Sequence, residues 1–123
     1  EYVQVRILAK TYGQEIRRDY SKINLSNYTS AFINEHTHAE VIDGVKSLDG
    51  IFMIYAKKGD AISFNQKFMF PLLRRPHDST TTMRFYSSTK EEPSTIDDAT
   101  KLGEYTITWP DNNDSVDITV EIT

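Results

Sequence analysis

The chain carries, at residues 67–86, the stretch KFMFPLLRRPHDSTTTMRFY, in which two mostly alternating apolar runs flank a polar turn. Phe68, Phe70 and Leu72 share one side of the first run, while Met83 and Phe85 share one side of the second. Such alternation places the apolar residues on one face of an extended strand. A third alternating run, KLGEYTI at 101–107, follows an acidic loop. This order predicts strand, turn, strand, loop and strand in an antiparallel sheet.

The rest of the chain also predicts mainly strands. Further short apolar or alternating runs occupy residues 2–7, 11–16, 51–56 and 116–122, and helix-period patterning is nearly absent. Strands with one polar face are typical of antiparallel sheets that have one side in water. We therefore predict an all-β fold, an antiparallel β-sandwich. The 123 residues fit a single domain, and because the first residue is not Met we expect a fragment of a longer protein.

One long segment, residues 17–49, breaks the strand pattern and is interpreted as an irregular insertion. A short helix is possible within residues 26–43, with Phe32, Ile33, Val41 and Ile42 as its apolar positions. A connection of this length inside a compact domain tends to be functional or mobile. The second irregular stretch, residues 89–100, is acidic and is predicted to be a solvated loop.

Composition excludes several function classes. The net charge of −4 and the pI of about 5.3 argue against nucleic-acid binding, which needs a basic face. The absence of cysteine excludes a disulfide scaffold and fits a reducing compartment, so we expect a cytoplasmic protein. No apolar run approaches the ~20 residues of a membrane helix, and no membrane or cofactor partner is predicted.

The clusters of polar residues in the sequence give little indication of catalysis. His36 and His38, with flanking carboxylates, offer two possible zinc ligands, but a polar loop with two solvated histidines is favoured because no third ligand is evident. Asp111, Asp114 and Asp117 lack the spacing of a calcium loop and indicate an ordinary turn. No nucleophile triad or phosphate-binding glycine loop occurs. We predict no metal site and no enzyme activity.

Several short motifs nevertheless form a recognisable order. They are Tyr12-Gly13 followed by Ile16, the segment Lys58–Ile62, the aromatic Phe70, the strand containing Met83, and Leu102-Gly103-Glu104-Tyr105, which is the most specific. In this order they resemble the β-sandwich half of the substrate-binding domain of the 70-kilodalton heat-shock chaperones. The resemblance covers everything but the insertion. The enlarged first loop is similar to that of a divergent branch of the family.

This resemblance implies a domain that holds extended hydrophobic peptide segments of client proteins without catalysis. Binding would combine backbone hydrogen bonds with an apolar pocket, and the implied peptide-binding residues are Ile16, Phe70, Leu73, Thr81, Met83 and Phe85. The insertion replaces a short loop that arches over the peptide, so we expect it to cover or flank the groove. In the intact protein the family has a nucleotide-binding domain, two further strands and a helical lid, none of which is in this chain.

Two other functions remain open. The sandwich could be an interaction scaffold whose groove is filled by its own insertion, or, with less support, a carbohydrate-binding domain. The regular run 116–122 would also display an unpaired strand edge, which predicts a possible homodimer.

Overall fold

The computed structural model describes residues 5–40, 44–75 and 78–122, and its secondary structure is dominated by strands. The elements in chain order are β1 (Val5–Ile7), β2 (Thr11–Asp19), the 3-10 turns η1 (Tyr20–Lys22) and η2 (Leu25–Asn27), α1 (Ser30–His36), β3 (Thr37–Ala39), β4 (Lys46–Ala56), β5 (Ala61–Ser63), β6 (Gln66–Leu73), β7 (Thr80–Ser88), β8 (Thr100–Thr108) and β9 (Ser115–Ile122). Every strand pairing is antiparallel. The predicted all-β, sandwich-like fold is confirmed.

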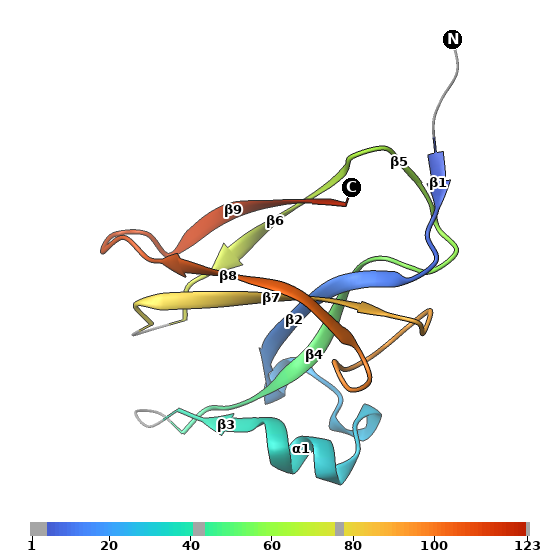
Figure 1. The fold of residues 1–123 in the computed structure, drawn as a ribbon. Coiled ribbons are helices and arrows are strands. Elements are labelled where there is room, and N and C mark those ends of the chain that lie inside the picture. The colour runs from blue at the N-terminus through green and yellow to red at the C-terminus, as the bar shows by residue number, and fades with distance from the viewer. Residues whose placement is uncertain (1–4, 41–43, 76–77, 123) are drawn as a thin grey trace.

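The main layer is a five-stranded sheet in the order β3-β4-β2-β7-β8, and β6 and β9 form a separate two-stranded ladder. In Figure 1 the β6–β9 ladder lies on one side of the large sheet, while α1 lies on the other. Aromatic contacts join the two strand layers, because the ring of Tyr55 on β4 stacks on Phe68 of β6 at a centroid distance of 5.7 Å. A short β1–β5 pair completes the structure.

Two small hydrophobic cores hold these layers. The first contains buried side chains near the two chain ends, with Tyr12 and Phe68 packed against them: Leu8, Ala56, Ile62 and Ile122. The second lies under α1 and consists of Phe32, Leu48 and Ile51. Burial of apolar surface in each cluster stabilises the fold.

The predicted insertion is partly strand, which corrects its boundaries. Strand β2 continues through Asp19 and β4 already begins at Lys46, so the irregular part is shorter than residues 17–49. The possible helix is present as α1 over Ser30–His36, where the Thr29 side chain accepts a hydrogen bond from the backbone N–H of Phe32. Phe32 is buried, as its position in the expected helix implied. Ile33 is half-buried and packs against the same core. The remaining two apolar positions, residues 41 and 42, lie outside the described residues.

The carboxylates of the acidic loop are exposed, as predicted, but its backbone is held against β4. Its Pro93 is buried, and its backbone bonds to β4, with Phe52 N–H donating to Ser94 O at 3.1 Å and Ile96 N–H donating to Gly50 O at 2.9 Å. These bonds tie the loop to the sheet because the N–H of Phe52 and the C=O of Gly50 find partners there. The loop therefore runs antiparallel beside an edge of β4, with Thr95 opposite Ile51.

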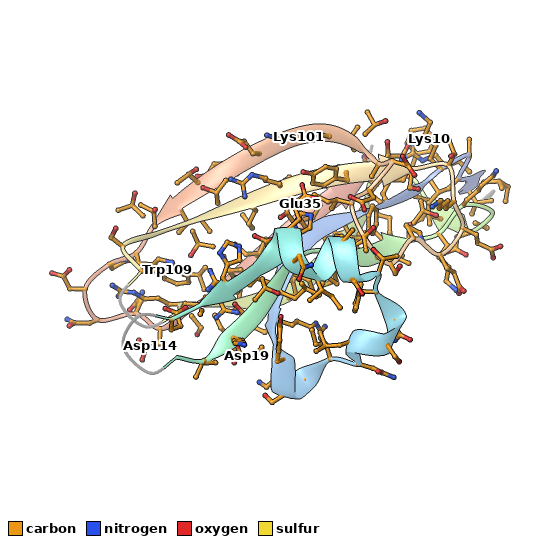
Figure 2. The ribbon with its side chains drawn as sticks, turned by 90° about the horizontal axis from the view of Figure 1, so that it is seen from below. Lys10, Asp19, Glu35, Lys101, Trp109 and Asp114 are labelled. Carbon is orange, nitrogen blue, oxygen red and sulfur yellow. The ribbon has the colours of Figure 1, made fainter. Side chains whose placement is uncertain are left out.

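Figure 2 shows the molecule from the side of α1. Trp109 and Asp114 lie toward the end of the molecule opposite Lys10. The turn between β6 and β7 lies near them, since Arg74 N–H donates to Asp114 O and Trp109 N–H donates to Ser79 O. No helix among the described residues is long and apolar enough to span a membrane.

Candidate functional site

The five-stranded sheet opens between β2 and β7. These strands pair only from Thr11 opposite Ser88 to Gln14 opposite Phe85. Beyond that point residues 15–19 of β2 pair with β4, and residues 80–84 of β7 pair with β8. We call the opening between residues 15–19 and 80–84 the fork. In a strand, alternate N–H and C=O groups point to opposite edges, so each arm of the fork directs backbone donors and acceptors into it.

A hollow of about 520 Å³ lies at the fork, and we call it the fork groove. Its walls come from β2, β7, the start of β4, the end of β6 and the turn after it. The lining residues are Gln14, Glu15, Ile16, Arg17, Arg18, Asp49, Pro71, Leu72, Leu73, Arg75, Asp78, Thr80, Thr81, Thr82, Met83 and Arg84. The groove thus combines free strand edges with both apolar and charged side chains.

Four of the six implied peptide-binding residues line this groove. Met83 is buried, Ile16 and Thr81 are half-buried, and Leu73 is 70% exposed. The hydroxyl of Thr81 already accepts a hydrogen bond from Trp109 Nε1–H at 2.7 Å. Of these four, Ile16, Leu73 and Met83 are the apolar lining residues, although Ile16 also packs against the second core. Thr81 is tied to Trp109, and Pro71 and Leu72 add further apolar surface.

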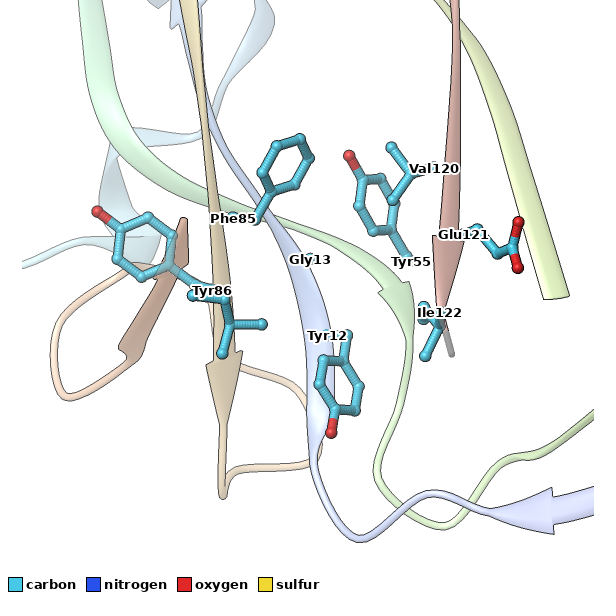
Figure 3. A pocket seen from close by; sticks show the side chains of 9 residues that line it. Tyr12, Gly13, Tyr55, Phe85, Tyr86, Val120, Glu121 and Ile122 are labelled. Carbon is cyan, nitrogen blue, oxygen red and sulfur yellow. The ribbon is translucent and has the colours of Figure 1, made fainter. Parts of the chain in front are cut away.

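The other two implied residues lie elsewhere. Phe70 packs against the ring of Tyr55 at 5.8 Å between the two layers. Phe85 lines a second hollow, of about 340 Å³, which we call the inter-sheet cavity. Figure 3 shows Phe85 there with Tyr12, Tyr55 and Val120. The structure thus divides the six residues between the fork groove and the space between the layers.

The inter-sheet cavity is lined mainly by packed aromatic and aliphatic side chains. The Tyr55 hydroxyl donates a hydrogen bond to Gln14 Oε1, and burial raises the pKa of Tyr55 far above its ordinary value. Gln14 itself is 3% exposed. Burial, and then the neighbouring Glu15 carboxylate, likewise raise the pKa of Tyr86, whose hydroxyl donates to Glu15 Oε1 at 3.3 Å. Both phenols are neutral, hydrogen-bonded parts of the structure.

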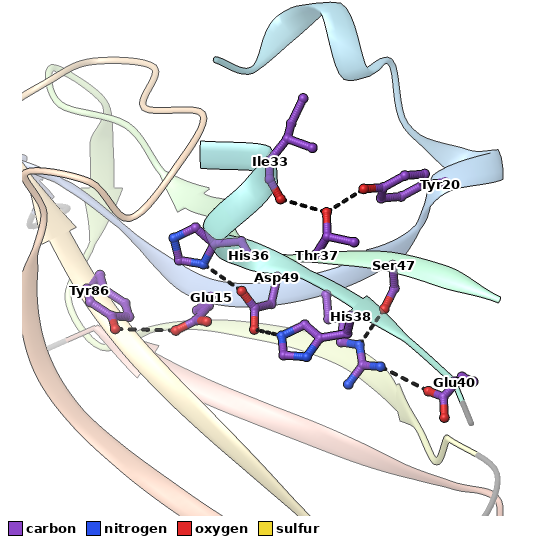
Figure 4. A network of polar contacts seen from close by, with 11 residues as sticks. Glu15, Tyr20, Ile33, His36, Thr37, His38, Glu40, Ser47, Asp49 and Tyr86 are labelled. Atoms are coloured by element: carbon purple, nitrogen blue, oxygen red, sulfur yellow. Dashed lines mark hydrogen bonds and ion pairs between the residues drawn. The ribbon is translucent and has the colours of Figure 1, made fainter. Parts of the chain in front are cut away.

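A polar network supports the β4 side of the fork groove. Asp49 bridges two histidines, with His36 Nδ1 at 2.6 Å from one carboxylate oxygen and His38 Nε2 at 2.5 Å from the other. Figure 4 shows this bridge beside the bonds from Arg17 to Ser47 and Glu40. The interpretation of two solvated histidines is therefore wrong for His36, whose side chain is 17% exposed, whereas the His38 side chain is 46% exposed. Among the described residues no group of three side chains could hold a metal ion.

The insertion does not cover the groove in the described part of the chain. Of residues 17–40 and 44–49, only Arg17, Arg18 and Asp49 line it, and these belong to β2 and β4. The helix instead buries Phe32 against Leu48. The expected cover role is thus wrong for these residues, because the apolar side of α1 is used in packing on β4.

An ion pair joins the end of β2 to the turn after β6, two elements that border the groove, and we call this place the groove's mouth. Arg75, on the turn after β6, places an Nη atom 3.3 Å from Asp19 Oδ1 at the end of β2. Sequence reasoning missed this pair and the other charged residues of the groove. The consecutive arginines at 17 and 18 were the available signal, since two basic residues at the end of a strand are unusual within an apolar site.

Comparison with known proteins returned no match: no family model, no curated protein and no solved structure is similar to this chain. The function is therefore inferred from the geometry of the fork groove and its surroundings.

Proposed function

We propose that this chain is a non-catalytic peptide-binding domain that holds extended hydrophobic segments of client proteins in the fork groove. One observation carries the proposal. Ile16, Leu73 and Met83, which come from three different strands, meet where β2 and β7 separate and leave backbone edges open. The resemblance to the substrate-binding sandwich of the 70-kilodalton heat-shock chaperones supports the same function.

Binding would use two kinds of contact. A peptide in the extended conformation can hydrogen-bond to an open strand edge, and each such bond contributes about 0.5–1.5 kcal/mol. One aliphatic side chain of the peptide would enter between Ile16 and Leu73, above Met83. Full burial of a Leu side chain contributes about 1.5–3 kcal/mol, so a few backbone bonds and one anchor yield modest, reversible affinity.

The placement of the insertion favours this function over a self-filled scaffold. The described residues between β2 and β4 pack through Phe32, Tyr28 and Ile23 on the second core and do not line the groove. The groove is therefore accessible to another chain. In the whole protein, a nucleotide-binding domain and a cytoplasmic location would accompany this function, as in the chaperone family.

A pair of exposed residues on β6 provides the test. Leu73 and Met69 are 70% and 74% exposed and lie on the same face of the strand, but only Leu73 lines the groove. We expect Leu73→Asp to weaken binding of a fluorescein-labelled Leu-rich peptide by about tenfold or more, because the anchor contact is lost. Met69→Asp is the matched control and should bind as the wild type does.

Fluorescence anisotropy measures both affinities, and circular dichroism checks that the variants remain folded. Equal weakening by the two variants would show that the fork groove is not the binding site. Failure of the wild-type domain to bind any Leu-rich peptide would exclude the proposed function.

A further inference from the structure

The fork groove concentrates arginine. Four arginines line it, and Arg6 and Arg74 are the only others in the sequence: Arg17, Arg18, Arg75 and Arg84. No lysine lines the groove, although the chain contains more lysines than arginines. The planar guanidinium group of arginine can donate two parallel hydrogen bonds to one carboxylate. In a chain of net charge −4 this is a local concentration of positive side chains.

Three of the four arginines already have acidic partners. Arg17 pairs with Glu40 at 2.9 Å, Arg75 with Asp19 at 3.3 Å and Arg84 with Glu104 at 3.5 Å. Arg18 differs, because it is exposed and, within the described part of the chain, makes no side-chain hydrogen bond or ion pair. Among the described residues, Arg18 is therefore the lining arginine whose guanidinium is free to bind an anionic ligand group.

The acidic lining residues do not neutralise Arg18. Glu15 accepts a hydrogen bond from the Tyr86 hydroxyl, and both oxygens of Asp49 are used by histidines. Asp78 also lines the groove, and no ion pair joins it to Arg18 among the described residues. An anionic group on the β2 side of the groove would thus meet Arg18 without a competing carboxylate bonded to it.

We propose that the fork groove selects extended peptides in which a Glu or Asp lies close to the apolar anchor residue. The proposal rests on the function proposed above and specifies its substrate class. Ile16 and Arg18 both line the groove from β2, two residues apart along the strand. A strand rises about 3.3 Å per residue, so a carboxylate within two or three residues of an anchor at Ile16 reaches the guanidinium of Arg18.

Three labelled peptides with one Leu-rich core, flanked by Glu, Gln or Lys, test the selection. At low salt the Glu peptide should bind about three- to tenfold more tightly than the Gln peptide, as an exposed ion pair allows, and the Lys peptide should bind least. Higher salt should reduce the difference because the pair is screened. Arg18→Gln should abolish the preference, so that the Glu and Gln peptides bind with equal affinity.

Lys10→Gln is the control, since Lys10 is exposed and lies outside the groove. It should leave the order of the three peptides intact, whereas Arg18→Glu should reverse it. If the Gln peptide binds but charge makes no difference, or if the Glu preference survives Arg18→Gln, this inference is wrong and the peptide-binding function stands. If none of the three peptides binds the wild type, both fail.

Discussion

Replacing Thr81 with Val should destabilise the domain while leaving peptide binding largely intact. Thr81 lines the fork groove, and the sequence implied a role for it in the peptide site. Its hydroxyl, however, accepts the Nε1–H of Trp109 at 2.7 Å, and Trp109 is only 4% exposed. Valine has nearly the same shape but cannot accept this hydrogen bond. The substitution therefore separates a structural role of Thr81 from a binding role.

The expected loss of unfolding free energy in Thr81→Val follows from the burial of the Trp109 indole. Removal of one partner leaves a buried donor unsatisfied, which costs about 1–3 kcal/mol. The higher strand propensity of valine offsets part of this cost, on a scale that spans about 1 kcal/mol. We expect a net loss of about 1–2 kcal/mol, which would lower the urea midpoint by roughly 0.5–1 M for a slope near 2 kcal/mol/M.

Trp109 supplies the signal, since it is the only tryptophan in the chain. Urea unfolding followed by its fluorescence gives the free energy of unfolding of the wild type and of Thr81→Val. Thr106→Val is the matched control, because Thr106 lies on the neighbouring strand and shares an exposed hydroxyl–hydroxyl contact with Thr82. The control should change stability by no more than about 0.5 kcal/mol.

Two results would contradict the reasoning. If Thr81→Val were as stable as Thr106→Val, the bond from Trp109 would not contribute to stability. If Thr81→Val kept its stability but lost more than about tenfold in affinity for a Leu-rich peptide, or about 1.4 kcal/mol, its hydroxyl would belong to the binding site.

Three further substitutions and one measurement test other parts of the structure. Asp19→Asn should cost at most about 1 kcal/mol of stability, and by releasing Arg75 it should speed peptide association in stopped-flow measurements; slower association would show that the ion pair does not restrict the mouth. Gly13→Ala should prevent folding, as judged by circular dichroism, because the added Cβ would lie 2.2 Å from a carbonyl oxygen of β4; a folded variant of normal stability would refute the close approach. Burial raises the pKa of Tyr55, so its contribution to stability is complete below the unfolded value of 10.0 and is lost as the pH rises through the higher folded value. Unfolding free energies measured above pH 10.0 should therefore fall less steeply in Tyr55→Phe, and an unchanged slope would exclude this assignment. Among the described residues, strand β9 pairs only with β6, so its other edge should drive self-association. A strict monomer in light scattering at ~100 µM, far above a micromolar Kd, would rule this out.

Alternation in the sequence best predicted the strands that have one buried and one solvent-exposed face. In β6 the exposure alternates at every residue, and in β9 it alternates nearly as regularly. The first half of β4 could not be found in this way, since Ser47 and Leu48 are adjacent and both fully buried. Helix α1 covers one face of β4 there, and a strand buried on both faces loses its alternation. Local pattern cannot show which faces a distant element will cover.

The same limit applies to the site. Alternation correctly grouped Phe70 with Leu72 and Met83 with Phe85 on strand faces, but it could not tell which part of each face opens to the groove. Phe85 lies just where the β2–β7 ladder ends, so Met83 lines the fork while Phe85 lines the inter-sheet cavity. The consecutive arginines at 17 and 18 were a local signal for the charged residues of the groove, but their partners depend on strand register across long loops, which no local signal reports.

The fork coincides with irregularities in β4, and β7 also shifts register against β8 between Phe85 and Tyr86. The pairing of β2 with β4 shifts register twice, and each shift leaves an extra residue on β4, near Tyr55 and near Gly50. Gly50 has φ +72, a conformation that glycine adopts without strain, and a bulge with such a residue bends its strand and increases the local twist.

Because β2 remains paired with β4 through both bulges, it turns with β4 and leaves β7 after Gln14. The second shift falls between Ile16 and Arg18, so Arg17 is not paired in register with any β4 residue. Arg17 reaches Glu40 beyond β4, while Arg18, back in register opposite Leu48, remains without an acidic partner in the described structure. The backbone irregularity that opens the groove thus also accounts for the different partners of two neighbouring arginines, and removing it by Gly50→Val should disturb the fork and the Arg18 selectivity together.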